Sequence, residues 1–231
     1  ESIQGKGEVG FTPSEDPNDE SYVANLLPEA YNTTWPIIFG SVKRVPIVKI
    51  KGPTDLLPKQ SHVYVIGCYS TITVSKVMAK RNCPGGKIDK GDLYIVPGSY
   101  YGIGTDTIGG KNVTILTLPT LLSEIKKEGW SDDIYVDCSS NLSSNPATQI
   151  SWILDNFTDL NINAASISAA AALVSVTPAN YVLFSQTDAV PLCEKIAWCA
   201  RCLLFIKNGT VYLRPLFINS VTNAVISLEE A

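Results

Sequence analysis

Short apolar segments separated by turn signals constrain the fold of this chain more than any other feature. Between residues 62 and 118 the segments "HVYVIG", "TITVSKV", "DLYIVPG" and "NVTILTL" are separated by "CPGGK", "KGD", "GSYYGIG" and "IGGKN". Short runs rich in Val, Ile, Thr and Tyr between Gly and Pro clusters are typical of strands in all-β domains. The spacing therefore predicts a small antiparallel β barrel or sandwich, assigned to residues 61–140 as a β-rich domain.

Two further elements are expected at the end of this region. The segment "PTLLSEIKKEGW" predicts a short helix, because its leucines and Ile125 form an apolar stripe and Gly129 stands at the stop. The segment "DIYVDC" predicts one more strand.

Residues 1–60 are expected to form an N-terminal arm and edge strands. The arm, to about residue 34, is polar and rich in turn residues. In "PIVKIK", Val48 and Ile50 share one face while Lys49 and Lys51 share the other, which is the period of a half-buried strand. Pro46 cannot donate to a central ladder, so this strand starts there or lies at a sheet edge.

Residues 141–231 predict an α+β domain with helices packed on a hairpin-containing sheet. Asn145 is a plausible N-cap for the helix "PATQISWILDNF", with Pro146 at its first position. The segment "AASISAAAALV" predicts a second helix, "NYVLFS" a strand, and Asp188 begins the helix "DAVPLCEKIAWCAR". Asn208-Gly209 between "CLLFIK" and "TVYLRPL" predicts a type I′ hairpin. The whole chain is thus expected to be α+β and strand-rich.

Composition argues against two classes of partner. The net charge of −4 disfavours a nucleic-acid binder, and the basic run "KRVPIVKIK" is interpreted as the solvated face of a strand. No apolar stretch is long enough to span a membrane, so stable membrane insertion is not expected. The chain begins at Glu1 without a signal peptide, so we expect a processed protein or a piece of a longer one.

The Cys199-x-x-Cys202 spacing raises the strongest question of chemistry. A structural zinc needs about four ligands, and the only histidine, His62, is far away in the sequence. A redox pair should open a helix, whereas this pair closes one. We therefore expect both thiols to pack as small buried hydrophobes, and all six cysteines to be reduced, although a metal or redox site stays an alternative.

The remaining motifs predict no catalytic, cofactor-binding or metal-ligating residue, so no cofactor and no enzymatic activity are expected. Gly102-x-Gly104 lacks the rest of a phosphate loop and is interpreted as a hairpin or loop tip. His62 is the one histidine and begins a predicted strand, so no Ser/His/Asp set is proposed except around it, and Ser131–Asp133 does not match a calcium loop.

A secreted or surface β-rich binding module is the main alternative class. It is suggested by polar turns and five N-x-S/T sequons, although chance explains them in a chain rich in Asn, Ser and Thr. The sequon residues are Asn32, Asn112, Asn141, Asn156 and Asn208.

The order of elements in the C-terminal third resembles the central hub or tail-tip proteins of tailed bacteriophages. The helix "NPATQISWILDNFTDL" leads to "NYVLFSQTDAV", then to "LCEKIAWCARCLLFI" and the hairpin "KNGTVYLRPL"; the early "WPIIFGSVKRVPIVKI" is also similar to a segment near the start of such proteins. The positions that match the pattern are scaffold positions: Ile196, Ala197, Arg201, Leu203, Gly209 and Leu213.

This resemblance implies a structural virion protein of the hub or baseplate, which joins the tail tube to the tip or spike and lines the DNA exit channel. It implies a homotrimer, assembled in the host cytoplasm, that contacts the tail tube or distal tail ring and the spike or fibre. Residues 61–140 would then be an inserted β-rich domain. The resemblance implies no ligand or catalytic residue, and an acidic chain suits a channel that should not hold DNA.

Overall fold

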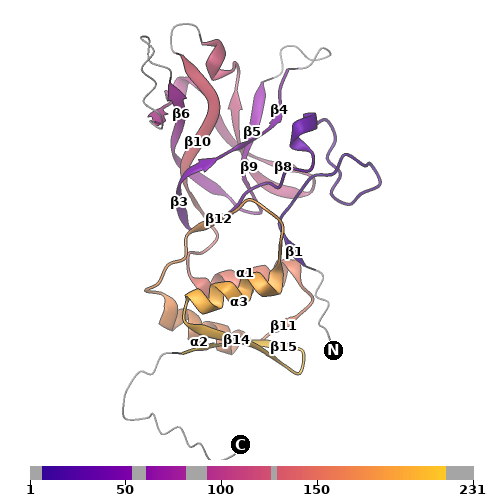
Figure 1. The fold of residues 1–231 in the computed structure, drawn as a ribbon, viewed down its shortest axis with the longest axis vertical. Helices are drawn as coiled ribbons and strands as arrows, with labels where there is room; N and C mark the ends of the chain where they lie inside the picture. The colour runs from indigo at the N-terminus through magenta and orange to yellow at the C-terminus, as the bar shows by residue number, and fades with distance from the viewer. Residues whose placement is uncertain (1–6, 54–60, 82–92, 126–128, 217–231) are drawn as a thin grey trace, which may run out of the picture. The chain divides into compact units, whose positions relative to one another are not determined.

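The computed structural model describes residues 7–53, 61–81, 93–125 and 129–216 (Figure 1). Its contacts divide the chain into two compact units. Residues 8–144 and 179–187 form the first, called here the sandwich unit. Of the described residues, 7, 145–178 and 188–216 form the second, called the helical unit.

Two four-stranded sheets make up most of the sandwich unit. Their strand orders are β3-β10-β6-β7 and β4-β5-β9-β8, and every pairing within them is antiparallel (Figure 1). The first sheet consists of β3 (Ser41–Pro46), β10 (Trp130–Ser140), β6 (Ile72–Arg81) and β7 (Leu93–Ile95). The second consists of β4 (Val48–Lys51), β5 (His62–Cys68), β9 (Lys111–Leu118) and β8 (Gly102–Ile108).

One hydrophobic core contains side chains of both sheets, so the two sheets pack face to face. Val77 and Val136 of the first sheet and Ile66 and Leu116 of the second are each at most 1% exposed. Within the described residues this is a sandwich, and the two sheets do not close into a barrel. The predicted strand-rich α+β class is confirmed, and of its two β architectures the structure has the sandwich.

A single chain segment supplies an edge strand to each sheet. Strand β3 ends at Pro46, and after Ile47 the chain continues as β4 in the other sheet. Pro46 lies on an edge strand, as its missing N–H requires. Because β3 pairs with β10 and β4 with β5, residues 41–51 belong to the sandwich unit with residues 61–140, rather than to a separate N-terminal part.

The glycine run after residue 98 contains a strand that its sequence does not predict. Strand β8 forms a hairpin with β9, and the two-residue turn is Gly109-Gly110, with φ of +57° and +69°. Residues 102–107 are all exposed, so no alternation of buried and exposed positions marks this edge strand. The predicted hairpin exists, but its tip lies after Gly102-x-Gly104, which is in the strand.

The predicted helix after residue 118 is wrong in the residues that the structure describes. Only a 3-10 turn, η3 (Leu122–Glu124), forms there, and Ile125 is already extended. Leu122 is fully buried in the sandwich core, whereas Leu118 belongs to β9. The burial of Leu122 stabilises only this single turn. Residues 126–128, which the predicted helix included, lie outside the described residues.

The polar N-terminal segment packs against the sandwich through a few apolar side chains. Phe11 forms an isolated bridge with Trp35, and their rings meet edge to face at 5.0 Å. Its regular elements are β1 (Glu8–Val9), which pairs with β13 (Thr187–Asp188), and the 3-10 turn η1 (Pro28–Ala30). Strand β2 (Ile37–Phe39) pairs with β12 (Tyr181–Leu183), and a second 3-10 turn, η2 (Gly98–Tyr100), precedes β8.

The helical unit has three helices and a three-stranded sheet that contains the predicted hairpin. The predicted strand "NYVLFS" does not join this sheet, because β12 (Tyr181–Leu183) pairs with β2, and residues 179–187 belong to the sandwich unit instead of the predicted 141–231 domain. The helices are α1 (Pro146–Phe157), α2 (Ala164–Val174) and α3 (Ala189–Cys199). The sheet has the order β11-β15-β14, with β11 (Asn161–Ile162), β15 (Thr210–Pro215) and β14 (Cys202–Lys207). Helix α2 packs against β15 and α3 against β14, while α1 contacts both helices (Figure 1). The parallel pairing of β11 with β15 is an addition that the sequence does not predict.

The start of α1 and the turn between β14 and β15 have the local structure that the sequence predicts. Asn145 caps α1, because its Oδ1 accepts from the backbone N–H groups of Ala147 at 3.0 Å and Thr148 at 3.4 Å. The hairpin turn has φ of +51° at Asn208 and +73° at Gly209, as a type I′ turn requires.

Substitutions of Asn145 should separate two roles of this side chain. Its Oδ1 caps α1, while its Nδ2 donates to the carbonyl of Ala171 at 2.9 Å. Replacing Asn145 with Ala removes both roles and should lower the free energy of unfolding by about 1–2 kcal/mol. Replacing it with Asp keeps the acceptor only and should cost less.

Chemical denaturation of the purified protein measures both effects. Thr148→Ala, an exposed position in the first turn of the same helix, is the matched control and should change stability little. Equal losses for the Ala and Asp variants of Asn145 would contradict the capping role.

Candidate functional site

The two cysteines of the Cys199-x-x-Cys202 motif differ in burial and in secondary structure. Cys202 is 3% exposed and begins β14, whereas Cys199 is exposed at the end of α3. Arg201 takes a φ of +56°, so the chain reverses between helix and strand. Leu203 therefore lies in β14 and not on the helix. The packing prediction therefore holds for Cys202 and is wrong for Cys199.

Burial makes the other described thiols poor nucleophiles. It raises the pKa of Cys68 and of Cys193 to about 12 and that of Cys138 to about 11. It also raises the pKa of Cys202. These four and Cys199 are free thiols, and Cys83 lies outside the described residues. Within the described chain, no group of three or more His, Cys, Asp or Glu residues could hold a metal ion.

His62 is buried at the start of β5, with 6% of its surface exposed. Its pKa is lowered, first by burial and then by the charge of Lys49, so the imidazole is neutral at neutral pH.

Residues 131–133 lie where the register of β10 against β6 shifts. Asp132 accepts hydrogen bonds there from the backbone N–H of Ser123 at 3.0 Å and from its hydroxyl.

The sequon asparagines fall into two groups. Asn112 lies in β9 and Asn156 in α1, while Asn32, Asn141 and Asn208 lie outside strands and helices. In the Asn112 sequon the threonine, Thr114, is only 1% exposed, and its hydroxyl accepts from the N–H of Ile72. That sequon is therefore a poor glycosylation acceptor, because its hydroxyl is committed to the fold.

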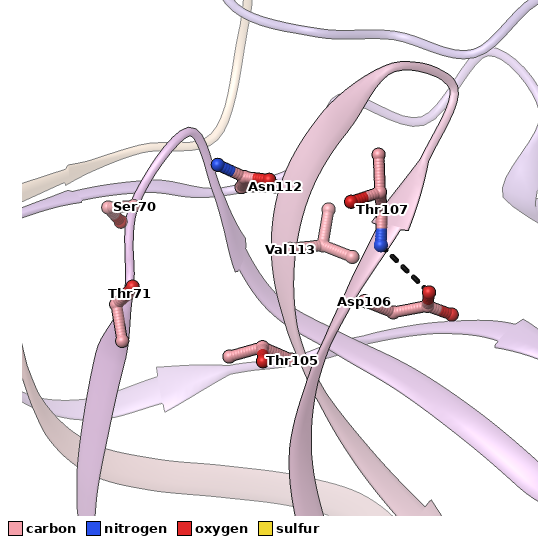
Figure 2. A pocket seen from close by; sticks show the side chains of 7 residues that line it. All are labelled: Ser70, Thr71, Thr105, Asp106, Thr107, Asn112 and Val113. Carbon is pink, nitrogen blue, oxygen red and sulfur yellow. Dashed lines mark hydrogen bonds between the residues drawn. The ribbon is translucent and has the colours of Figure 1, made fainter.

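A shallow polar groove lies between the β5–β6 turn and the β8–β9 hairpin (Figure 2). Its volume is about 280 Å³. The backbone N–H of Thr107 donates to Asp106 at 2.8 Å (Figure 2). Asp106 is the only carboxylate among the lining residues, which offer no second titratable group for acid–base chemistry. The groove is lined by Ser70, Thr71, Thr105, Asp106, Thr107, Asn112 and Val113.

The outward face of the β14–β15 hairpin is apolar and aromatic. Leu203 is 50% exposed and Phe205 37% exposed, and the rings of Phe205 and Tyr212 stack at 5.3 Å with an angle of 10°. Strand β14 is also the edge of its sheet, so one side of its backbone has no strand partner among the described residues. We call this surface the hairpin face; its members are Leu203, Phe205, Lys207, Tyr212 and Arg214.

The positions that carry the hub resemblance divide between the core and this surface. Ile196, Ala197 and Leu213 are buried and hold α3 on the hairpin. Gly209 and Arg201 supply the two turns that bound β14. Leu203 belongs to the hairpin face. Trp198, near the end of α3, is 76% exposed and is therefore not in the core of this chain.

No family model, curated protein or solved structure matches the chain. None of the helices that the structure describes is long and apolar enough to cross a membrane.

Thiol labelling should separate Cys199 from the other described cysteines. At pH 8 the native protein should react with a maleimide reagent at Cys199, which is exposed. Cys193, with a pKa of about 12, should have about a thousandfold less thiolate than an unperturbed thiol as well as no access. Its reactivity should rise only on unfolding or as the pH approaches that raised pKa.

Peptide mass spectrometry assigns each label and reports Cys83 separately. Labelling in denaturant, which should modify every cysteine, is the control. Protection of Cys199 in the native protein, or equal labelling rates at Cys193 and Cys199, would contradict the exposure of Cys199 at the end of α3.

Proposed function

We propose that this chain is a structural protein of a bacteriophage tail. It forms part of the hub or baseplate that joins the tail tube to the tip or spike, and it lines the channel through which DNA leaves. The observation that carries the proposal is the hairpin face, whose apolar side chains Leu203 and Phe205 no described residue covers fully, on the part of the chain that resembles hub proteins.

The exposed edge strand β14 of the helical unit's sheet supports a role in assembly. Exposed edge strands invite pairing with other chains, and soluble proteins usually protect them with charges, prolines or bulges. Strand β14 has two large apolar side chains on its outward face, and the charges beside them are Lys207 on the same strand and Arg214 on β15, opposite Leu203. Larger exposed apolar surfaces of this kind mark protein interaction sites. A structural role in an assembly explains why this surface is exposed in a single chain.

The proposed assembly is a homotrimer that contacts other tail proteins, such as the tail tube or distal tail ring and the spike or fibre. We place it in the virion, after assembly in the host cytoplasm. The net charge of −4 supports a channel that lets DNA pass without specific binding.

Charged substitutions on the hairpin face should disrupt self-association. The complete protein should form an oligomer of three chains, and Leu203→Lys with Phe205→Lys should shift it toward the monomer by at least about tenfold in dissociation constant. Analytical ultracentrifugation over a range of concentrations measures the shift.

The matched control changes exposed apolar residues of other strands. Ile95→Lys in β7 and Ile103→Lys in β8, which are 61% and 44% exposed, should leave the oligomer intact. A wild-type protein that stays monomeric would contradict the assembly role. An oligomer that the hairpin variants do not weaken would contradict the assigned surface.

A further inference from the structure

A second cavity of about 270 Å³ lies in the sandwich unit, on the opposite edge of the second sheet from the β8–β9 hairpin. It forms where the chain passes from β3 to β4 beside the first residues of β10. Its lining residues are Pro46, Ile47, Lys49, Tyr64, Asp132, Asp133, Ile134 and Tyr135.

Two irregularities of strand pairing open this cavity. The register of β10 against β6 shifts between Trp130 and Ile134, and that of β4 against β5 shifts between Lys49 and Lys51. The N–H of Ile47 donates to the carbonyl of Ile134 at 3.3 Å and fixes the corner between the two sheets. Bulges of this kind re-aim side chains and are enriched beside binding sites.

Tyr64 is the residue that points to a ligand. Its side chain lines the cavity but is only 3% exposed, and its buried hydroxyl has no hydrogen-bond partner within the described chain. An unpaired buried hydroxyl is costly, because it has lost its contact with bulk water. The nearby carboxylate of Asp132 is already held by Ser123. Burial first, and the charge of Asp132 second, raise the pKa of Tyr64, so the phenol stays neutral and can donate.

The charges on the cavity walls decide what kind of ligand fits. Lys49, the cross-strand neighbour of Tyr64, offers only donors, whereas Asp133 on the facing strand offers only acceptors. A simple anion would be repelled by the carboxylates of Asp132 and Asp133, and a simple cation would be repelled by the ammonium group of Lys49. A zwitterion would have to lose the water around two charges, which costs far more than removing water from neutral hydroxyls.

Neutral hydroxyl groups satisfy all three polar residues, because each can donate and accept. The remaining walls, from Pro46, Ile47, Ile134 and Tyr135, are suited to the C–H face of a ring. The volume lies just below the roughly 300–1,000 Å³ of drug-sized sites, which suits a ligand of one ring.

We propose that this cavity binds a neutral saccharide ring, with its hydroxyls on Tyr64, Lys49 and Asp133 and its apolar face on Ile47 and Tyr135. The site lies away from the hairpin face in sequence and in sheet, and it does not depend on how the chain assembles.

Saturation-transfer NMR tests the proposal with the complete protein. The probes are glucose, galactose, mannose and N-acetylglucosamine, each at millimolar concentration. At least one should receive magnetisation from the wild-type protein, and Tyr64→Phe, which removes only the hydroxyl, should weaken its binding about tenfold. Lys49→Met should also weaken it, and gives a second readout if the buried tyrosine does not tolerate change.

Tyr22→Phe, which removes the hydroxyl of an exposed tyrosine in the N-terminal segment, is the matched control and should bind as the wild type does. Absence of transfer from all four sugars would overturn the proposal and indicate that water alone satisfies Tyr64. Binding that Tyr64→Phe and Lys49→Met leave unchanged would place the sugar elsewhere. Either failure leaves the oligomeric state, and so the proposed tail function, untouched.

Discussion

The sandwich depends on a row of valines that crosses three strands. Val136 of the central strand β10 lies opposite Val45 of β3 on one side and Val77 of β6 on the other, and each is at most 2% exposed. These contacts join segments about 60 to 90 residues apart in sequence. They remove one face of the sheet from water and create the surface on which the second sheet packs.

The sequence predicts the elements whose local chemistry is strong. Short runs of β-branched and other apolar residues between turn residues mark β5, β6 and β9, although β5 is buried on both faces and shows no alternation. The start of α1 and the turn before β15 are predicted for a different reason. Asn145 and Asn208-Gly209 satisfy requirements of a single turn, which distant contacts do not alter.

The features that the sequence does not predict all depend on distant contacts. Strand β8 has no buried face over residues 102–107, so only its pairing with β9 makes it a strand. Cys199 continues a helical stripe in the sequence, but the left-handed backbone of Arg201 ends the helix and leaves the thiol exposed. Tyr64 reads as an ordinary core residue. Its hydroxyl, which has no hydrogen-bond partner among the described residues, lies in a cavity beside register shifts of β4 and β10 that the sequence does not predict. Among the candidate sites, the sequence thus raises the cysteine motif but gives no signal for the cavity.

The helical unit and the sandwich unit suggest a division of roles under the proposed function. The first presents an apolar sheet edge suited to assembly, and the second holds the polar cavities. The central claim is that the hairpin face is an assembly surface of a tail hub. Cryo-electron microscopy of the complete protein tests this claim most directly. We expect a threefold ring in which Leu203 and Phe205 are covered by a neighbouring chain. Single chains, or a ring that leaves both side chains in solvent, would contradict the assembly role.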